Sequence, residues 1–223
     1  MIAMFDAAIF DWDGTLADTR RPIVASFHQA LREVGLDVTT EYIERRIGIG
    51  ASDTFRDILR AEGRPVDEEV VKALVARKSE LQVEMADMVQ LFSGAEELLA
   101  SLQGKVKVAL ASMNNSIVIG HLLKVKGLED CFEMVMTGDR VGKSKPDPEI
   151  FLKTAQALNV RPECCVVFED SIFGVKAAKA AGMSCIAVTT GVYSAAELER
   201  EKPDLVIKTL SDAEISRFIF GQE

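Results

Sequence analysis

Short apolar runs alternate with amphipathic segments along much of the chain. Such runs, bounded by polar or turn-forming residues, are typical of strands buried on both faces of a parallel sheet, and the segments between them have helical periodicity. This alternation predicts an α/β fold with a Rossmann-like parallel sheet that is covered by helices on both faces. The predicted strands are Ala7–Asp11, Val106–Ala111, Phe132–Met136, Cys165–Glu169, Ser184–Val188 and Asp204–Ile207. Helical patterns follow the second to fifth of them, at Ser116–Lys126, Pro148–Leu158, Ile172–Ala181 and Ala195–Glu201.

One long segment breaks the alternation. From about Asp18 to Leu102 the apolar positions follow helical periodicity only, and no strand is predicted there. We expect an inserted α-helical cap over residues 22–89 and an α/β core formed by residues 1–21 and 90–223. Because both ends of the insertion return near the first strand, the cap can hinge over the end of that strand as a lid. The predicted helices are Asp18–Val34, Glu41–Arg46, Ser52–Ala61, Glu68–Met88 and Ala95–Leu102.

Two acids, Asp11 and Asp13, directly follow the first predicted strand. Open α/β sheets bind ligands at the carboxyl ends of their strands, and Gly14 lets the chain turn there, so we expect both acids to approach one centre. One carboxylate can then attack a phosphorus atom while the other transfers protons. For this motif alone, a purely structural Asp-Gly turn is the alternative. The spacing lacks the further acids of an EF-hand loop.

A second acidic pair, Glu169 and Asp170, ends the fourth predicted strand. Asp170 alone is also a candidate cap for the following helix. Four converging carboxylates would repel one another unless a cation binds. Hard oxygen ligands without nitrogen or thiol neighbours favour Mg²⁺. We therefore predict a Mg²⁺ site whose ligands come from Asp11, Asp13, Glu169 and Asp170.

Two further candidates, Ser112 and Lys145, follow the second and third predicted strands. The Ser112 hydroxyl can bind a phosphate oxygen, because Asn115 or Ser116 is available to cap the next helix. Pro146 favours an extended backbone at Lys145, which turns that side chain away from the helix start. A lysine between carboxylates and phosphate neutralises the charge that phosphoryl transfer accumulates. Considered alone, Ser112 is also consistent with a helix cap, and Lys145 is also consistent with a solvated surface residue.

Composition and charge narrow the set of partners. Of 223 residues, 48% are hydrophobic, and the net charge is −9 with a pI near 4.9. This charge repels nucleic acid and anionic membranes, no Lys/Arg run forms a basic patch, and no apolar stretch approaches membrane-spanning length. We therefore expect neither nucleic acid nor a membrane as a partner.

Four cysteines without a Cys-x-x-Cys pair, and no signal-peptide pattern, predict a cytoplasmic protein. The sequence indicates no particular oligomeric state.

Two other features do not point to alternative chemistry. His28 and His121 both fall in helical patterns without a serine or cysteine partner motif, so a Ser-His-Asp hydrolase is not supported. Gly48-Ile49-Gly50 does not follow a strand, so it lacks the context of a dinucleotide-binding loop. We interpret it as a turn of the insertion that faces the substrate.

In their order along the chain, these motifs resemble the haloacid dehalogenase-like hydrolase superfamily, in the subgroup with a helical cap after the first strand, which is similar to phosphoglycolate phosphatases and β-phosphoglucomutase. The resemblance implies that Asp11 is the nucleophile and forms an aspartyl-phosphate. It implies that Asp13 protonates the leaving oxygen and later activates water. Asp11, the backbone carbonyl of Asp13 and Asp170 would bind Mg²⁺, with Glu169 acting directly or through a water.

The resemblance also assigns Ser112 and Lys145, and with them Asn114, to phosphate binding, and the first two to catalysis. Dehalogenases of the superfamily lack an acid at the position of Asp13, so dehalogenation is disfavoured. Mutases similar to β-phosphoglucomutase carry a histidine where alignment places Ile23 and a phosphate-gripping arginine where it places Ala51.

We therefore predict a phosphatase acting on a small phosphomonoester, a sugar phosphate or a phosphoglycolate-like acid. A sugar-phosphate mutase stays open as an alternative, since another cap arginine can replace the missing one. A non-catalytic binding protein on the same fold is the alternative of another class, although no motif acid is lost. The candidate arginines are Arg20, Arg21, Arg45, Arg46 and Arg56.

Overall fold

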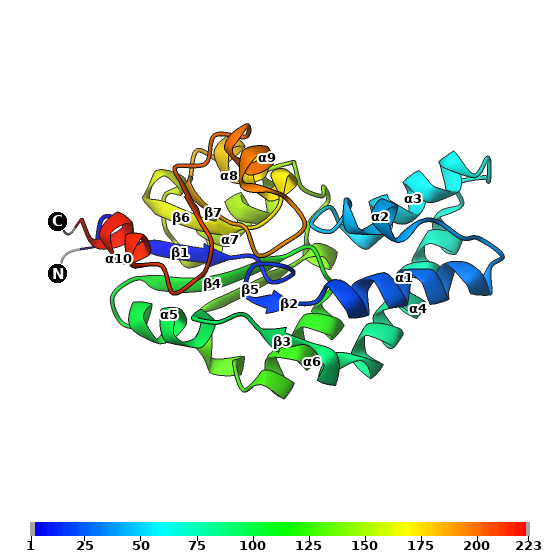
Figure 1. The fold of residues 1–223 in the computed structure, drawn as a ribbon, viewed down its shortest axis with the longest axis horizontal. Coiled ribbons are helices and arrows are strands. Elements are labelled where there is room, and N and C mark those ends of the chain that lie inside the picture. Colours follow the sequence, from blue (N-terminus) through cyan, green and yellow to red (C-terminus); the bar gives the residue numbers. More distant parts are fainter. Residues whose placement is uncertain (1–2, 222–223) are drawn as a thin grey trace.

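The computed structural model describes residues 3–221. Its centre is a six-stranded sheet in the order β5-β4-β1-β6-β7-β8, with every neighbouring pair parallel (Figure 1). The predicted fold class and all six predicted strands are confirmed. The strands are β1 (Ala7–Phe10), β4 (Lys107–Ser112), β5 (Met134–Thr137), β6 (Cys165–Glu169), β7 (Ser184–Val188) and β8 (Leu205–Ile207).

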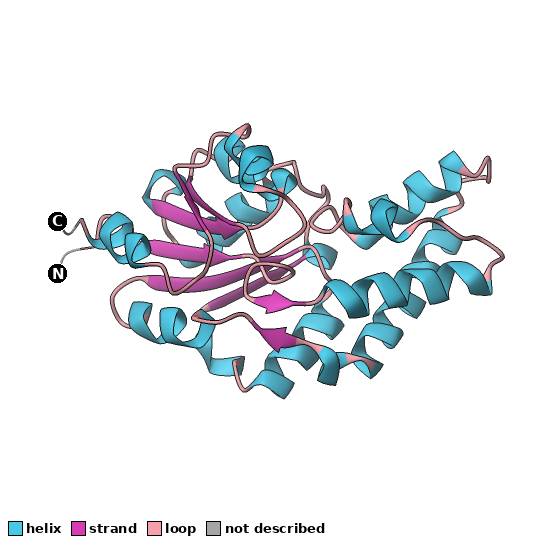
Figure 2. Cartoon of the chain, viewed as in Figure 1, coloured by secondary structure: helices cyan, strands magenta, loops and turns pink. Residues whose placement is uncertain are grey.

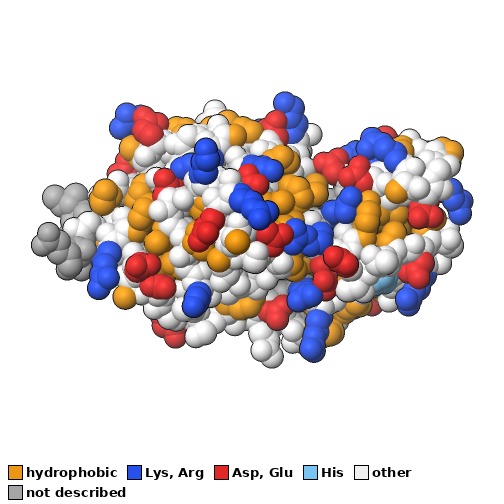
Figure 3. Space-filling model, turned by 45° about the horizontal axis from the view of Figure 1, so that its top comes forward, with side chains coloured by type: hydrophobic (Ala, Val, Ile, Leu, Met, Phe, Trp, Pro, Cys, Tyr) orange, Lys and Arg blue, Asp and Glu red, His pale blue; other side chains and the backbone are white. Residues whose placement is uncertain are grey.

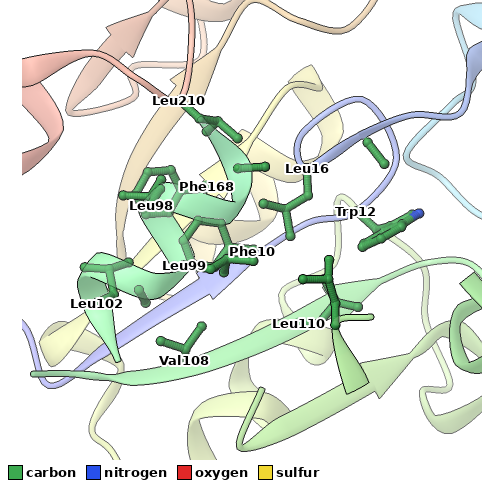
Figure 4. Close-up of a cluster of buried hydrophobic side chains, with 14 of the residues drawn as sticks. Phe10, Trp12, Leu16, Leu98, Leu99, Leu102, Val108, Leu110, Phe168 and Leu210 are labelled. Atoms are coloured by element: carbon green, nitrogen blue, oxygen red, sulfur yellow. The ribbon is translucent and has the colours of Figure 1, made fainter. Parts of the chain in front are cut away.

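Helices cover both faces of this sheet, as expected for a parallel sheet (Figure 2). Alternate residues of β1 enter different clusters: Ala8 and Phe10 pack with α5, α6 and α10, whereas Ala7 and Ile9 pack with α7, α8 and α9. Figure 4 shows the first cluster, in which the rings of Phe10 and Phe168 stack 4.4 Å apart. These helices are α5 (Ala95–Leu102), α6 (Ser116–Lys126), α7 (Glu149–Leu158), α8 (Ile172–Ala180), α9 (Ala195–Glu199) and α10 (Ala213–Phe220).

Two helix starts settle alternatives that the sequence left open. The Asn115 side chain accepts a hydrogen bond from the Val118 backbone N–H at 3.0 Å, so Asn115 caps α6. Ser171 caps α8 by accepting from the Gly174 N–H at 3.0 Å. The interpretation of Asp170 as a cap is therefore wrong, because the neighbouring serine hydroxyl already satisfies the helix start. Within residues 3–221, four short 3-10 helices connect other elements: Ala86–Met88, Glu129–Cys131, Gly138–Arg140 and Pro162–Cys164.

The insertion after β1 is helical and has a hydrophobic cluster of its own. Phe27 and Phe55 lie at its centre with ring centroids 4.7 Å apart. In Figure 1 its helices extend beyond the carboxyl end of β1, on the opposite side of the molecule from the termini. The exact limits of the cap, residues 22 and 89, stay a prediction. Its helices are α1 (Arg20–Glu33), α2 (Thr40–Glu44), α3 (Ala51–Ala61) and α4 (Glu68–Glu84).

One expectation about this region is wrong. Strand β2 (Ala17–Asp18) pairs antiparallel with β3 (Gln90–Leu91), although no strand was predicted between Asp18 and Leu102. Strands of two residues are too short to show a period of two, so only tertiary pairing reveals them. The pair lies at the two ends of the insertion and holds its entry and exit side by side, which is the arrangement a hinge requires.

Two general properties of the described residues complete the fold. No helix within residues 3–221 combines the length and apolar character that a membrane crossing needs. All four cysteines are free thiols. On the face drawn in Figure 3, basic and acidic side chains are interspersed.

Candidate active site

The carboxyl ends of β1, β4 and β6 lie at the same edge of the sheet, because Phe10 pairs in register with both Leu110 and Phe168. The residues that follow these strands therefore meet there. The structure brings all seven predicted site residues to this edge and buries each of them. They are Asp11, Asp13, Ser112, Asn114, Lys145, Glu169 and Asp170.

Lys145 occupies the centre of the group. Its Nζ donates to Asp11 Oδ1 at 2.6 Å and to Glu169 Oε1 at 2.5 Å, and it also reaches the Ala111 carbonyl at 3.3 Å. Burial opposes the lysine charge, but the two carboxylates outweigh it and raise the pKa of Lys145. The residue is 1% exposed, so the alternative of a solvated surface lysine is wrong.

Three carboxylates converge beside this lysine. Asp11, Glu169 and Asp170 each offer one oxygen, and these oxygens lie within 4.8 Å of one another. Asp170 also accepts a hydrogen bond from the Thr15 hydroxyl at 3.0 Å. Burial raises the pKa of Asp11 to about 8 and that of Asp170 well above its usual range. A single lysine does not balance three buried acids, so this all-oxygen donor set fits a hard divalent cation such as Mg²⁺.

Glycines allow this close packing of acids. Gly14 has a φ of 88°, and a β-carbon there would overlap the Asp170 carboxylate. Gly174 lies inside α8, where a β-carbon would overlap the Glu169 carboxylate. The close approach of α8 to the end of β6 therefore explains why a glycine, which destabilises a helix interior, occupies this position.

Asp13 lies apart from the three-carboxylate cluster. Its Oδ2 accepts from Asn114 Nδ2 at 3.1 Å, and the Ser112 hydroxyl approaches the same oxygen at 3.5 Å. Ser112 Oγ in turn accepts the Asn114 backbone N–H at 3.1 Å. Burial raises the pKa of Asp13. A carboxyl group that keeps its proton closer to neutral pH is suited to act as a general acid.

The structure adds one residue that the sequence reasoning missed, Lys78 of the cap helix α4. Its Nζ donates to Asn114 Oδ1 at 3.2 Å and to the Gln82 side chain, and the residue is 4% exposed. Burial lowers the pKa of Lys78 to about 8, against the opposing effect of Asp13. A signal existed in the sequence, because Lys78 occupies a position on the apolar face that α4 forms with Leu74 and Leu81.

A small cavity lies between the cap and the core, directly over Asp11 and Asp13. Its volume is about 30 Å³, which is room for roughly two water molecules. Ile23 and Ala51, the two positions compared above with the histidine and arginine of the mutases, line this cavity. So do Gly48 and Gly50, as expected for a turn that faces the substrate. His28 and His121 are not among the lining residues.

Cap and core contact each other on both sides of this cavity. On one side, Arg45 Nη2 lies 2.6 Å from Glu197 Oε1, and the Tyr193 hydroxyl donates to the Arg45 carbonyl at 2.6 Å. On the other side, Asn115 Nδ2 donates to the Ser79 hydroxyl at 2.5 Å. These contacts hold the cap against the core over the acidic site.

Three known proteins show what the chain is similar to. A CBBY-like protein of Arabidopsis thaliana is 36% identical over 231 residues, covering 95% of this chain and 71% of that protein. The fructose-1-phosphate phosphatase YqaB of Escherichia coli (strain K12) is 32% identical, covering 84% of this chain and 98% of that protein. The crystal structure of β-phosphoglucomutase from Clostridium difficile superimposes with a TM-score of 0.85 at 27% identity, covering 97% of this chain and 96% of that one.

A family model places these similarities in one group. The model for haloacid dehalogenase-like hydrolases matches residues 8–188, which include β1 from Ala8 onward, the helical insertion, and strands β4 to β7 with the loops that carry the site. The acids, the serine and the lysine that suggested this family all meet at one buried site. The chain belongs to the haloacid dehalogenase-like hydrolases.

Proposed function

We propose that this protein is a Mg²⁺-dependent phosphatase that hydrolyses a small phosphomonoester through an aspartyl-phosphate on Asp11. The observation that carries the proposal is the buried arrangement of Asp11 between Lys145 and two further acids, with Asp13 close by and outside that cluster. The Escherichia coli relative, which is named as a fructose-1-phosphate phosphatase, supports the same reaction class.

The chemistry follows from the position of each side chain. Asp11 attacks the phosphorus atom, while Lys145 and Ser112 hold the phosphoryl oxygens and offset their charge. Asp13, with its raised pKa, gives its proton to the leaving oxygen. It then takes a proton from the water that hydrolyses the aspartyl-phosphate. Asn114 fixes the Asp13 carboxylate through the 3.1 Å hydrogen bond and belongs to the same phosphate-binding group.

The acids that would hold Mg²⁺ are Asp11, Asp170 and Glu169, together with the backbone carbonyl of Asp13. When bound, the ion supplies positive charge that draws the phosphoryl group towards the nucleophile and screens the repulsion between phosphate and carboxylates. The protein's own contribution is to keep these oxygens close together in a site from which bulk water is excluded.

The cap of residues 22–89 acts as the lid in this proposal. A cavity of about 30 Å³ is too small for a phosphomonoester, so the cap must open for substrate to enter. The cap then closes over the bound substrate and keeps water away from the phosphoryl group until the leaving group has departed. The adjacent ends of the insertion at β2 and β3 provide the hinge.

A sugar-phosphate mutase is the second candidate, since the β-phosphoglucomutase structure has the same fold. Ile23 and Ala51 argue against it, because both line the cavity and neither is the histidine or the arginine that the resemblance expects of a mutase at these positions.

The test is phosphate release from a panel of phosphomonoesters with Mg²⁺, measured for the native protein and for Asp11→Asn. Release that the variant loses supports the phosphatase. Interconversion of hexose 1- and 6-phosphates that is faster than hydrolysis establishes the mutase instead. No turnover of any substrate by the native protein would favour the non-catalytic binding protein.

A further inference from the structure

A single core loop contacts both the acidic site and the cap. This loop comprises residues 189–194 and joins β7 to α9. Near its start, the Thr190 hydroxyl donates to the Gly14 carbonyl at 2.6 Å. At Gly191, a β-carbon would overlap the Asp170 carboxylate, so the loop backbone lies directly against this acid. Because Gly14 approaches the same carboxylate, Asp170 has little room to move without displacing one of the two backbone segments.

The far end of the 189–194 loop holds the cap. Tyr193 is buried and donates its hydroxyl to the Arg45 carbonyl at 2.6 Å. The Arg45 guanidinium carbon lies 4.2 Å from the centre of the Tyr193 ring, and Arg45 Nη2 lies 2.6 Å from Glu197 Oε1. The ring of Phe173 in α8 meets Tyr193 edge-on at 6.3 Å, which limits movement of the tyrosine. One arginine of the cap therefore docks on this loop and on the helix that follows it.

The same cap segment rests on the neighbour of a second acid. Gly48 approaches Ser171 so closely that a β-carbon would lie 2.7 Å from the Ser171 hydroxyl oxygen. That hydroxyl donates to Glu169 Oε2 at 3.0 Å. Residues 45–48 of the cap therefore dock on groups that themselves contact Asp170 and Glu169.

The charges of the site give this arrangement a direction. Three buried carboxylates repel one another, and a bound divalent cation removes much of that repulsion. Without the cation we expect the Asp170 carboxylate to shift and to displace the 189–194 loop, which lies against it. With the cation Asp170 is held, and the loop keeps the position in which Tyr193 reaches Arg45. A ligand shifts a conformational equilibrium only through such a difference between two states.

We propose that the 189–194 loop couples cation binding to cap closure. A divalent cation held by Asp170 favours the closed cap, and the closed cap in turn tightens cation binding by the same factor, because such coupling is reciprocal. This inference rests on the proposed Mg²⁺-dependent function. It makes Tyr193 and Arg45 positioning residues that touch neither the phosphoryl group nor the cation.

Calorimetric titration with Mg²⁺ alone measures the binding half of this coupling. Tyr193→Phe removes one hydrogen bond to the cap and no charge, and it should weaken Mg²⁺ binding by about 2- to 10-fold. Arg45→Gln should weaken Mg²⁺ binding as well. The direction is informative, because the loss of a positive charge near a cation site would by itself strengthen cation binding. The control Arg77→Gln breaks an ion pair with Glu33 that lies wholly within the cap, and it should leave the affinity within about twofold.

Amide hydrogen exchange measures the conformational half. In the native protein, Mg²⁺ without substrate should slow exchange in residues 43–50 of the cap as well as in residues 189–194 of the core. Tyr193→Phe should reduce the effect in residues 43–50. Protection confined to residues 189–194 would show that Mg²⁺ orders the loop without closing the cap, and it would overturn the inference.

The affinities separate this inference from the proposed function. An affinity for Mg²⁺ that is unchanged or raised in either Tyr193→Phe or Arg45→Gln overturns the coupling. If the native protein releases phosphate with Mg²⁺ while both variants bind Mg²⁺ as tightly as it does, the proposed function stands and only the coupling fails. If the native protein binds no Mg²⁺, the metal-dependent function and the coupling fail together.

Discussion

Gly174→Ala tests whether the Glu169 carboxylate must occupy the place that the structure gives it. A β-carbon at Gly174 overlaps this carboxylate, so either Glu169 or α8 has to move. Glu169 Oε1 accepts a hydrogen bond from Lys145 Nζ at 2.5 Å, and Glu169 Oε2 accepts one from the Ser171 hydroxyl at 3.0 Å. Displacing Glu169 therefore breaks a buried ion pair and loosens the start of α8.

Two opposing magnitudes decide the outcome. Alanine is favoured over glycine inside a helix by up to about 1 kcal/mol. Breaking a buried ion pair while one partner stays buried costs about 3–5 kcal/mol. We expect a net destabilisation of about 2–4 kcal/mol, together with a fall in phosphate release of about 10²-fold or more because Lys145 loses its position.

The matched control is Gly120→Ala, in the middle of α6. A β-carbon at Gly120 meets no atom within 4 Å, so only the helix preference remains. This variant should gain about 0.5–1 kcal/mol and keep full activity. Urea unfolding followed by circular dichroism measures both variants. If Gly174→Ala is as stable and active as Gly120→Ala, Glu169 is not confined as described and the reasoning is wrong.

Three further predictions concern the same site. Asp13→Ala should slow phosphate release by about two to four orders of magnitude, because it removes the general acid; near-native turnover would refute that role. Replacing Mg²⁺ by Ca²⁺ should inhibit, since Ca²⁺ prefers more ligands and a looser geometry, and undiminished turnover with Ca²⁺ alone would contradict the predicted metal site. Lys78→Met should raise stability at pH 7 and lower activity. The pKa of Lys78 is about 8 in the folded protein and about 10.5 in the unfolded chain. Between these two pH values the unfolded state binds more protons than the folded state. The free energy of unfolding of the native protein should therefore rise, relative to that of the variant, by about 1.4 kcal/mol per pH unit from pH 8 to 10. Equal slopes in denaturant titrations across this range would show that folding does not lower the pKa of Lys78.

The sequence was most informative where structure depends on neighbours along the chain. Buried parallel strands need unbroken apolar runs, so β1 and β6 are plain in the sequence. The meeting of the acids that follow these two strands could be predicted because the carboxyl ends of parallel strands lie at one edge of the sheet. The strands β2 and β3 and the terminal helix α10 were not predicted, since two residues carry no period and a single short helix outside the alternation gives a weak pattern.

Contacts between the cap and the core could not be predicted in the same way. Lys78 reaches Asn114 across 36 positions, and Arg45 reaches Glu197 across 152. Such pairs depend on how two separately packed units dock, which no local pattern encodes. For the same reason the sequence offered five cap arginines for one role, whereas the structure shows three of them in ion pairs with nearby carboxylates, namely Arg20, Arg45 and Arg56.

Trp12 lies between the two acids at the end of β1 and is the only tryptophan in the chain. Its indole is fully buried in the cluster shown in Figure 4. All indole emission of this protein therefore originates at the loop that carries Asp11 and Asp13. Ligand arrival and release at this loop can be followed by stopped-flow fluorescence on the unlabelled native enzyme, with a single emitter whose position is known.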